Sequence, residues 1–100
     1  MANKLLLFAV FLQTLNISAY TPYECGNART ASGTIPCEGR TIAADHLPFG
    51  TKVVINGRTY VVEDRFGSGY KDRIDIFMGD YQRAIQFGRQ WITCRVETPE

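Results

Sequence analysis

The stretch Asp64-Arg-Phe-Gly-Ser-Gly-Tyr-Lys-Asp-Arg-Ile-Asp75 joins two short β-rich segments, 60–63 and 74–77. Both segments read as strands, and the connection contains glycines, which predicts a loop that folds back between two strands of one sheet. Such a loop brings Asp64 and Asp75 to one surface. Two carboxyl groups at one cleft are what acid–base cleavage of sugar chains requires. Aspartate beside glycine also commonly caps a turn, so a purely structural role stays open.

Further strand signals lie on both sides of this loop. Asn56-Gly57 stands between two β-rich runs and predicts a hairpin with a type I′ turn. The last segment alternates, with Ile92 and Cys94 on one face and Trp91 on the other. The predicted strands are 15–19, 41–44, 51–55, 58–63, 74–77 and 90–97. About six short strands are too few for a two-sheet sandwich and favour a small closed barrel.

One helix is predicted before the last strand. Asp80 suits its N-cap and Gly88 is placed to end it. Tyr81, Ala84 and Ile85 would form its apolar stripe.

The composition is that of one small globular domain. One hundred residues with 45% hydrophobic and 21% charged side chains can form a single core without metal or many disulfides. The net charge is +1 and no Lys/Arg run occurs, so a nucleic-acid partner is not expected. The single histidine, His46, and the absence of a Cys-x-x-Cys motif leave too few ligands for zinc. No metal or organic cofactor is implied.

The three cysteines, Cys25, Cys37 and Cys94, allow one internal disulfide and leave one thiol over. Cys25–Cys37 is the locally closest pair, while Cys37–Cys94 and Cys25–Cys94 stay open. One of the cysteines could form a catalytic Cys-His pair with His46, but nothing near any cysteine indicates an activated thiolate.

The amino-terminal segment has the form of a signal peptide. Lys4 precedes the apolar run 5–12, which is too short to span a bilayer, since spanning takes about 20 apolar residues. Ala19 is the best small residue for cleavage, but cleavage there would remove the strand-like segment 15–19. We therefore interpret residues 1–13 as a signal or anchor segment and 14–98 as the folded domain. Export is favoured over a cytoplasmic location.

Three aspartates, Asp45, Asp64 and Asp75, thus stand at predicted strand ends. Their setting resembles the 3D domain, a family named for three aspartates. That domain is related to the barrel of membrane-bound lytic transglycosylase A and to muralytic stationary-phase proteins of Gram-positive bacteria. The matching pieces run in order through most of the chain and are 30–33, 42–45, 48–53, 62–64, 73–76, Ala84 and 87–88.

The resemblance implies a mainly β fold, a small six-stranded double-psi β-barrel with one short helix, and a peptidoglycan substrate. It implies that Asp75 is the acid/base, that Asp64 supports the site beside it, and that Asp45 completes the trio in a chiefly structural role. The candidate substrate-binding residues in and around the matching loops are Thr30, Gly33, Arg65, Gly67, Tyr70 and Arg73.

The chemistry of such a site can be argued from the substrate. Cleaving the β-1,4 bond between N-acetylmuramic acid and N-acetylglucosamine needs an acid that protonates the leaving oxygen. A lytic transglycosylase then needs a base, so that the muramoyl C6 hydroxyl attacks its own anomeric carbon and gives a 1,6-anhydro product. One carboxyl can do both, whereas a hydrolase needs a second carboxylate. Burial and the nearby charge of Asp64 are expected to raise the pKa of Asp75 for this task.

The chain departs from the usual loop of the family, Asp-Thr-Gly-Gly-Ala-Ile-Lys-Gly-x-Arg-x-Asp. Arg65, Phe66 and Tyr70 replace a threonine, a glycine and a lysine, while the spacing from Asp64 to Asp75 is kept. Arg65 is expected to pair with Asp64 and to favour its ionised form.

Two functions follow as expectations. The first is a monomeric, secreted or wall-associated lytic transglycosylase, acting in wall remodelling or, if phage-encoded, in lysis. The alternative is a non-catalytic barrel that binds wall polysaccharide, as in expansin-like and barwin-like relatives. In that case Tyr20, Tyr23, Phe66 and Tyr70 would stack on sugar faces, although aromatic residues more often pack inside the protein.

Overall fold

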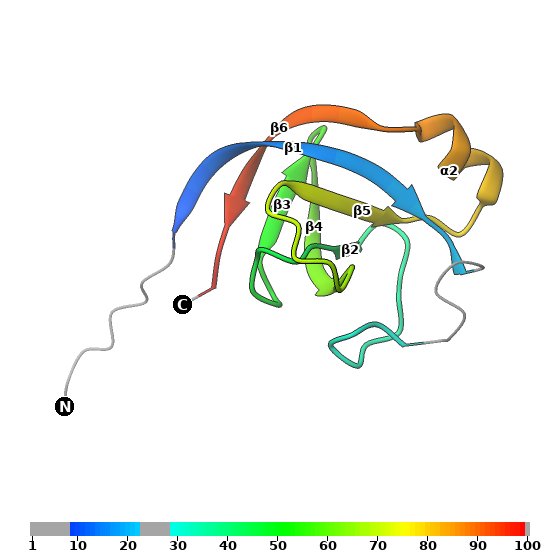
Figure 1. Ribbon diagram of the computed structural model, residues 1–100, viewed down its shortest axis with the longest axis horizontal. Coiled ribbons are helices and arrows are strands. Elements are labelled where there is room, and N and C mark those ends of the chain that lie inside the picture. Colours follow the sequence, from blue (N-terminus) through cyan, green and yellow to red (C-terminus); the bar gives the residue numbers. More distant parts are fainter. Residues whose placement is uncertain (1–8, 23–28, 100) are drawn as a thin grey trace.

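Strands make up most of the fold in the computed structural model, which describes residues 9–22 and 29–99 (Figure 1). The elements are β1 (Val10–Tyr20), β2 (Thr41–Ala43), β3 (Lys52–Ile55), β4 (Arg58–Asp64), β5 (Arg73–Phe77), α2 (Tyr81–Phe87) and β6 (Gln90–Glu97). The strands close into a barrel in the order β1-β5-β2-β4-β3-β6.

The strand pairing has an internal symmetry. β1 pairs with β5 and β2 pairs with β4 in parallel, while the other neighbours are antiparallel. Exchanging β1 with β4, β2 with β5 and β3 with β6 leaves the set of neighbours unchanged. The barrel thus consists of two equivalent three-stranded halves. The predicted mainly β fold, a six-stranded double-psi barrel with one short helix, is confirmed.

One apolar core fills the barrel. Leu15 and Ile17 on β1 and Ile74 on β5 are fully buried, and the residues between them face outward. Burying one such side chain stabilises the fold by about 1.5–3 kcal/mol. A slip of one residue would turn the whole set outward, so the core fixes the strand register. The core cluster comprises Leu15, Ile17, Ile42, Ala44, Leu47, Val53, Ile55, Val62, Ile74, Ile76, Cys94 and Val96.

The predicted hairpin is confirmed. Asn56 and Gly57 have φ angles of 50° and 80°, and a type I′ turn requires positive values at both central residues. The turn sets the register between β3 and β4, in which Ile55 lies opposite Arg58.

Helix α2 also begins and ends where predicted, but its packing differs. The Asp80 side chain accepts a hydrogen bond from the backbone N–H of Gln82 at 2.8 Å, and Gly88 ends the helix at φ 65°. Of the expected stripe only Ala84 is buried, whereas Tyr81 and Ile85 remain exposed. The prediction of an apolar stripe was wrong, because this two-turn helix contacts the barrel mainly through Ala84 and Phe87.

Strand β1 begins earlier than expected. It pairs with β6 from Val10, opposite Glu97, so the boundary expected at residues 13 and 14 falls inside the strand. Residues 1–8 lie outside the described part of the chain. None of the helices described in residues 9–22 and 29–99 is long and apolar enough to cross a membrane.

Candidate functional site

Four residues form a row across the outer face of the barrel. The register pairs Ser18 on β1 with Asp75 on β5, Asp75 with Ala43 on β2, and Ala43 with Asp64 at the end of β4. Residues paired in this way point to the same side of a sheet, and the neighbours of Asp75 along β5 point into the core. Asp64 and Asp75 therefore share one surface. Because β2 separates them, their Cα atoms are roughly 10 Å apart.

Asp75 is a half-buried carboxyl group. Its Oδ1 accepts a hydrogen bond from the Ser18 hydroxyl. Burial raises the pKa of Asp75, and the Ser18 bond and the charges of Arg89 and Arg73 offset this only in part. Of the two expected causes, burial raises the pKa of Asp75, whereas the charge of Asp64 is not among the causes of the shift. The group is suited to hold a proton that it can donate.

The Asp64 carboxylate is fixed by three donors. Its Oδ2 accepts a bond from the Tyr20 hydroxyl at 3.0 Å, and its Oδ1 accepts bonds from the backbone N–H groups of Ala31 and Arg65, both at 2.9 Å. These bonds come from β1, from the turn at residues 30–33 and from Arg65 itself. The side chain is therefore held in one orientation on the outer face.

The guanidinium of Arg65 reaches only the backbone carbonyl of Asp64, at 3.5 Å, and does not pair with its carboxylate, so the expected ion pair was wrong. Its Nη1 donates to the Ala44 carbonyl at 2.8 Å, and its Cζ lies 3.8 Å from the centroid of the Phe49 ring. These partners lie on the 44–49 segment and draw the guanidinium toward that segment. Arg65 thereby ties the start of the loop to this segment.

Asp45 organises the loop between β4 and β5. Its two oxygens accept four backbone N–H groups, those of Phe66, Gly67, Ser68 and Tyr70, at 2.7–3.2 Å. Burial opposes ionisation of the group, but the four hydrogen bonds outweigh it and lower the pKa of Asp45. In this geometry Asp45 holds the backbone of the loop at residues 66–70. Gly67, a candidate substrate contact, is exposed and has a φ of 82°.

The two aromatic residues of the loop pack edge to face. Phe66 packs on an outer cluster that includes Tyr20, and its ring centroid lies 5.3 Å from that of Tyr70. The Arg73 Cζ lies 4.5 Å from the centroid of the Tyr70 ring. Tyr70 is 37% exposed, whereas Tyr20 is 7% exposed and directs its hydroxyl to Asp64. Tyr23, also expected to contact sugars, lies outside the described residues.

The turn at residues 30–33 supports Asp64 from the side. Thr30 is buried, and its hydroxyl shares hydrogen bonds with those of Thr34 at 2.7 Å and Ser32 at 3.1 Å. Gly33 is exposed at φ 94° and donates its N–H to the Thr30 carbonyl. Of these two candidate substrate contacts, Gly33 is exposed, whereas the Thr30 side chain is buried and forms hydrogen bonds within its own segment.

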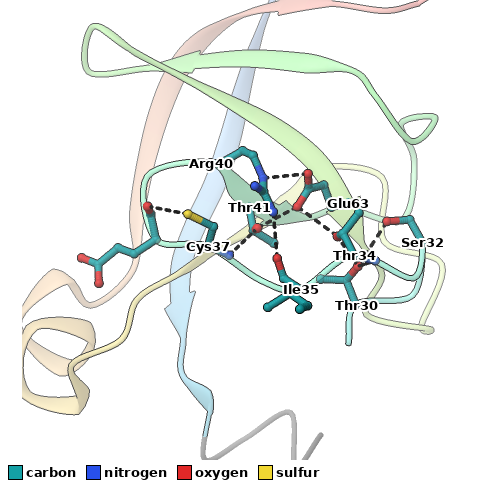
Figure 2. A network of polar contacts seen from close by, with 9 residues as sticks. Thr30, Ser32, Thr34, Ile35, Cys37, Arg40, Thr41 and Glu63 are labelled. Atoms are coloured by element: carbon teal, nitrogen blue, oxygen red, sulfur yellow. Dashed lines mark hydrogen bonds and ion pairs between the residues drawn. The ribbon is translucent and has the colours of Figure 1, made fainter. Parts of the chain in front are cut away.

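A buried carboxylate, that of Glu63, was not predicted from the sequence. Glu63, next to Asp64 on β4, is 9% exposed and pairs through Oε2 with the Arg40 Nε at 2.9 Å. Its Oε1 accepts bonds from the hydroxyls of Thr41 at 2.7 Å and Thr34 at 3.2 Å. Figure 2 shows the side chains of Thr34, Arg40 and Thr41 converging on Glu63. The polar tie fixes the 30–41 segment, including the turn beside Asp64.

The side chains of Cys37, Cys94 and His46 make hydrogen bonds with residues other than Asp64 and Asp75. Cys37 and Cys94 are free thiols, and burial raises the pKa of Cys94, while Cys25 lies outside the described residues. The His46 Nε2 shares a hydrogen bond with the Gln13 side chain at 3.1 Å. Burial lowers the pKa of His46, opposed by the charges of Asp72 and Asp45.

The outer face thus offers one proton-holding carboxyl, one fixed carboxylate and a loop with exposed aromatic surface. Within residues 9–22 and 29–99, no group of three or more His, Cys, Asp or Glu side chains is placed to hold a metal ion. No protein-family model matches the chain, and neither a curated protein nor a solved structure matches it.

Proposed function

We propose that the protein cleaves peptidoglycan strands as a lytic transglycosylase, the activity of the 3D domains that its motifs resemble. The observation that carries the proposal is Asp75, a half-buried carboxyl on the outer face whose pKa is raised by burial. A carboxyl that keeps its proton toward neutral pH can act as a general acid. The fixed carboxylate of Asp64 on the same face gives the site its second charged group.

The proposed reaction uses one carboxyl twice. Protonated Asp75 donates its proton to the oxygen between the muramoyl and glucosaminyl rings, and the bond from that oxygen to the anomeric carbon breaks. The Asp75 carboxylate then accepts the proton of the muramoyl C6 hydroxyl as its oxygen attacks the same carbon. The product is a 1,6-anhydro ring, no water is consumed, and Asp75 is protonated again. Between these steps the Ser18 hydroxyl stabilises the ionised carboxyl.

The separation of the two aspartates favours this route over a retaining hydrolase. A retaining hydrolase places its two carboxyl groups about 5 Å apart, so that one can attack the sugar. β2 lies between the strands of Asp64 and Asp75, which keeps their backbones roughly 10 Å apart. In the proposed reaction Asp64 stabilises the positive charge that develops at the anomeric carbon, without forming a bond to it.

A second candidate is a non-catalytic barrel that binds wall polysaccharide. The observation in its favour is Tyr70, whose ring is partly exposed and backed by Phe66 and Arg73. Both candidates place the protein at the cell wall, outside the cytoplasm, as a monomer acting on glycan strands.

A digest of purified peptidoglycan, with products identified by mass spectrometry, separates these functions. The wild type is compared with Asp75→Asn and with Asp80→Asn, a matched control because asparagine is an equally good N-cap. We expect anhydro-muropeptides from the wild type and the control and none from Asp75→Asn. Products with ordinary reducing ends would make the protein a hydrolase, with Asp64 as the second carboxylate. No soluble product from any variant, with all three sedimenting with the wall, would favour the binding barrel.

A further inference from the structure

The outer face continues from Asp75 toward β6. One step along the same face, Arg73 on β5 pairs with Asn16 on β1, and Asn16 pairs with Trp91 on β6. We name these three residues, together with Arg89, the Trp91 row. Trp91 is 61% exposed, so most of its ring surface lies in water. From strand spacing, the Cα atoms of Trp91 and Asp75 are roughly 12 Å apart, a distance that a short stretch of glycan can span.

Polar and charged side chains lie on the same face between Trp91 and Asp75. The Arg89 Nη1 donates to the Asn16 Oδ1 at 3.3 Å, which places a guanidinium beside the register partner of Trp91. Arg73 is stacked on Tyr70, at the other end of the row. The charges of both arginines act on the Asp75 carboxyl, so the row and the candidate site form one continuous surface.

The exposure of Trp91 does not serve the barrel. Other outward positions of β6 hold residues such as Thr93, whose hydroxyl bonds to Thr14 on β1 at 2.8 Å. A large aromatic ring left mainly in water forgoes most of the burial through which such a side chain stabilises a fold. A flat apolar ring flanked by hydrogen-bonding and cationic groups is suited to bind a sugar ring that bears anionic substituents.

Resting on the proposed function, we propose that the Trp91 row is a subsite for the glycan strand beyond the bond cleaved at Asp75. Trp91 stacks on the apolar face of a pyranose ring, and Asn16 is placed to hydrogen-bond to ring substituents. Arg89 and Arg73 bind carboxylates of the peptide stems that the strand carries. The row thus selects stem-bearing peptidoglycan over uncharged β-1,4 glycans.

Trp91 is the single tryptophan of the chain, so intrinsic fluorescence reports on this site alone. We would titrate the Asp75→Asn protein, in which the proposed acid is removed, with soluble stem-bearing glycan fragments. The expected result is a saturable change of the tryptophan emission. By calorimetry, Trp91→Ala should bind about tenfold more weakly and Trp91→Phe less than that, since phenylalanine keeps a stacking face. The control Tyr81→Ala, which removes an exposed aromatic ring on α2, should bind as before.

The arginines are tested with a second ligand. Chitin oligosaccharides have the same β-1,4 linkage but no carboxylates. Arg89→Gln should lose affinity for the stem-bearing fragments and keep its affinity for the chitin oligosaccharides. Equal losses for both ligands would overturn the assignment of the arginine to stem carboxylates.

The binding assay is independent of cleavage. An unchanged tryptophan emission with equal affinity for Trp91→Ala, or no binding of the fragments by the Asp75→Asn protein, would overturn this subsite even if the digest yields anhydro products. Conversely, a failed digest with Trp91-dependent binding would reject the transglycosylase and keep the Trp91 row as a binding surface for stem-bearing glycan. The two proposals therefore fail separately.

Discussion

Ser18 on β1 and Asp75 on β5 are register partners, and the Ser18 hydroxyl donates a hydrogen bond to the Asp75 carboxyl. The bond favours the ionised form and so opposes the effect of burial, which raises the pKa of Asp75. The Ser18 hydroxyl on one strand thereby lowers the pKa of the acid on the neighbouring strand.

This relationship predicts a pH profile. Because the acid must be protonated, cleavage should slow as the pH rises through the pKa of folded Asp75. Ser18→Ala removes the bond to the ionised form, raises this pKa further, and should move the alkaline limb to higher pH. Initial rates of peptidoglycan solubilisation from pH 4 to 8 measure it, with Ser68→Ala as the control. A limb that stays in place would argue against Asp75 as the acid.

Asp75 should also reduce the stability of the fold at neutral pH. Its pKa is higher in the folded than in the unfolded chain, so the folded state is penalised wherever the group ionises. Asp75→Asn removes the charge while its amide oxygen can still accept the Ser18 bond. We expect the Tm to rise by up to about 5 °C at pH 7. The difference should shrink at pH 3, where both proteins are neutral at this position. A variant that unfolds earlier at pH 7 would contradict the role of burial.

The opposite dependence is expected for Asp45. Its pKa is lowered in the folded state, so its contribution is present above the unfolded pKa and is lost as the pH falls through the folded value. Asp45→Ala leaves four loop N–H groups without their acceptor and should cost about 1–3 kcal/mol at pH 7. Denaturant unfolding measures this, and hydrogen exchange should show faster exchange at residues 66–70. The exposed loop residue Asp72, changed to alanine, is the matched control. Slow exchange in Asp45→Ala would refute the organising role of this carboxylate.

Glu63 should stabilise the fold and the site together. Removing it leaves the Arg40 Nε and the hydroxyl hydrogen of Thr41 without their acceptor, so Glu63→Ala should cost about 2–3 kcal/mol. Glu63→Gln keeps an acceptor and should cost less. Glu38→Ala, which removes an acid from an exposed pair with Arg83, should cost less than Glu63→Ala. Urea unfolding compares them. Similar losses for Glu63→Ala and Glu38→Ala would show that the tie in Figure 2 contributes little.

The parts of the fold that depend on neighbours in the sequence could be predicted. Asn56-Gly57 specifies its turn through positive φ angles, and Asp80 caps α2 with its own side chain. The inward side of β6 follows from simple alternation. The start of β1 was missed because its first residues, from Val10, continue an apolar run that resembles a leader.

The site depends on contacts that no local pattern encodes. Asp64 and Asp75 share a face because β2 lies between their strands, with a register shift between Ile42 and Ala43. The direction of Arg65 is decided by the Ala44 carbonyl, which comes from another segment. In the sequence, Glu63 shows only as an acidic residue on a predicted strand. Its burial becomes visible only in the folded structure, where the 30–41 segment covers it.

The place of β1 in the barrel has a consequence for how the protein is made. Its two neighbours are β5 and β6, the last two strands of the barrel in sequence order, and the backbone N–H of Thr98 bonds to the Ala9 carbonyl at 2.9 Å. During synthesis β1 therefore precedes both of its pairing partners and stays unpaired until β5 and β6 have been made. Barrel closure must wait for these two strands and be slow for a domain of this size, because every pairing of β1 with the sheet is long-range. During that interval its apolar residues Leu15 and Ile17 are open to capture by chaperones or by other chains.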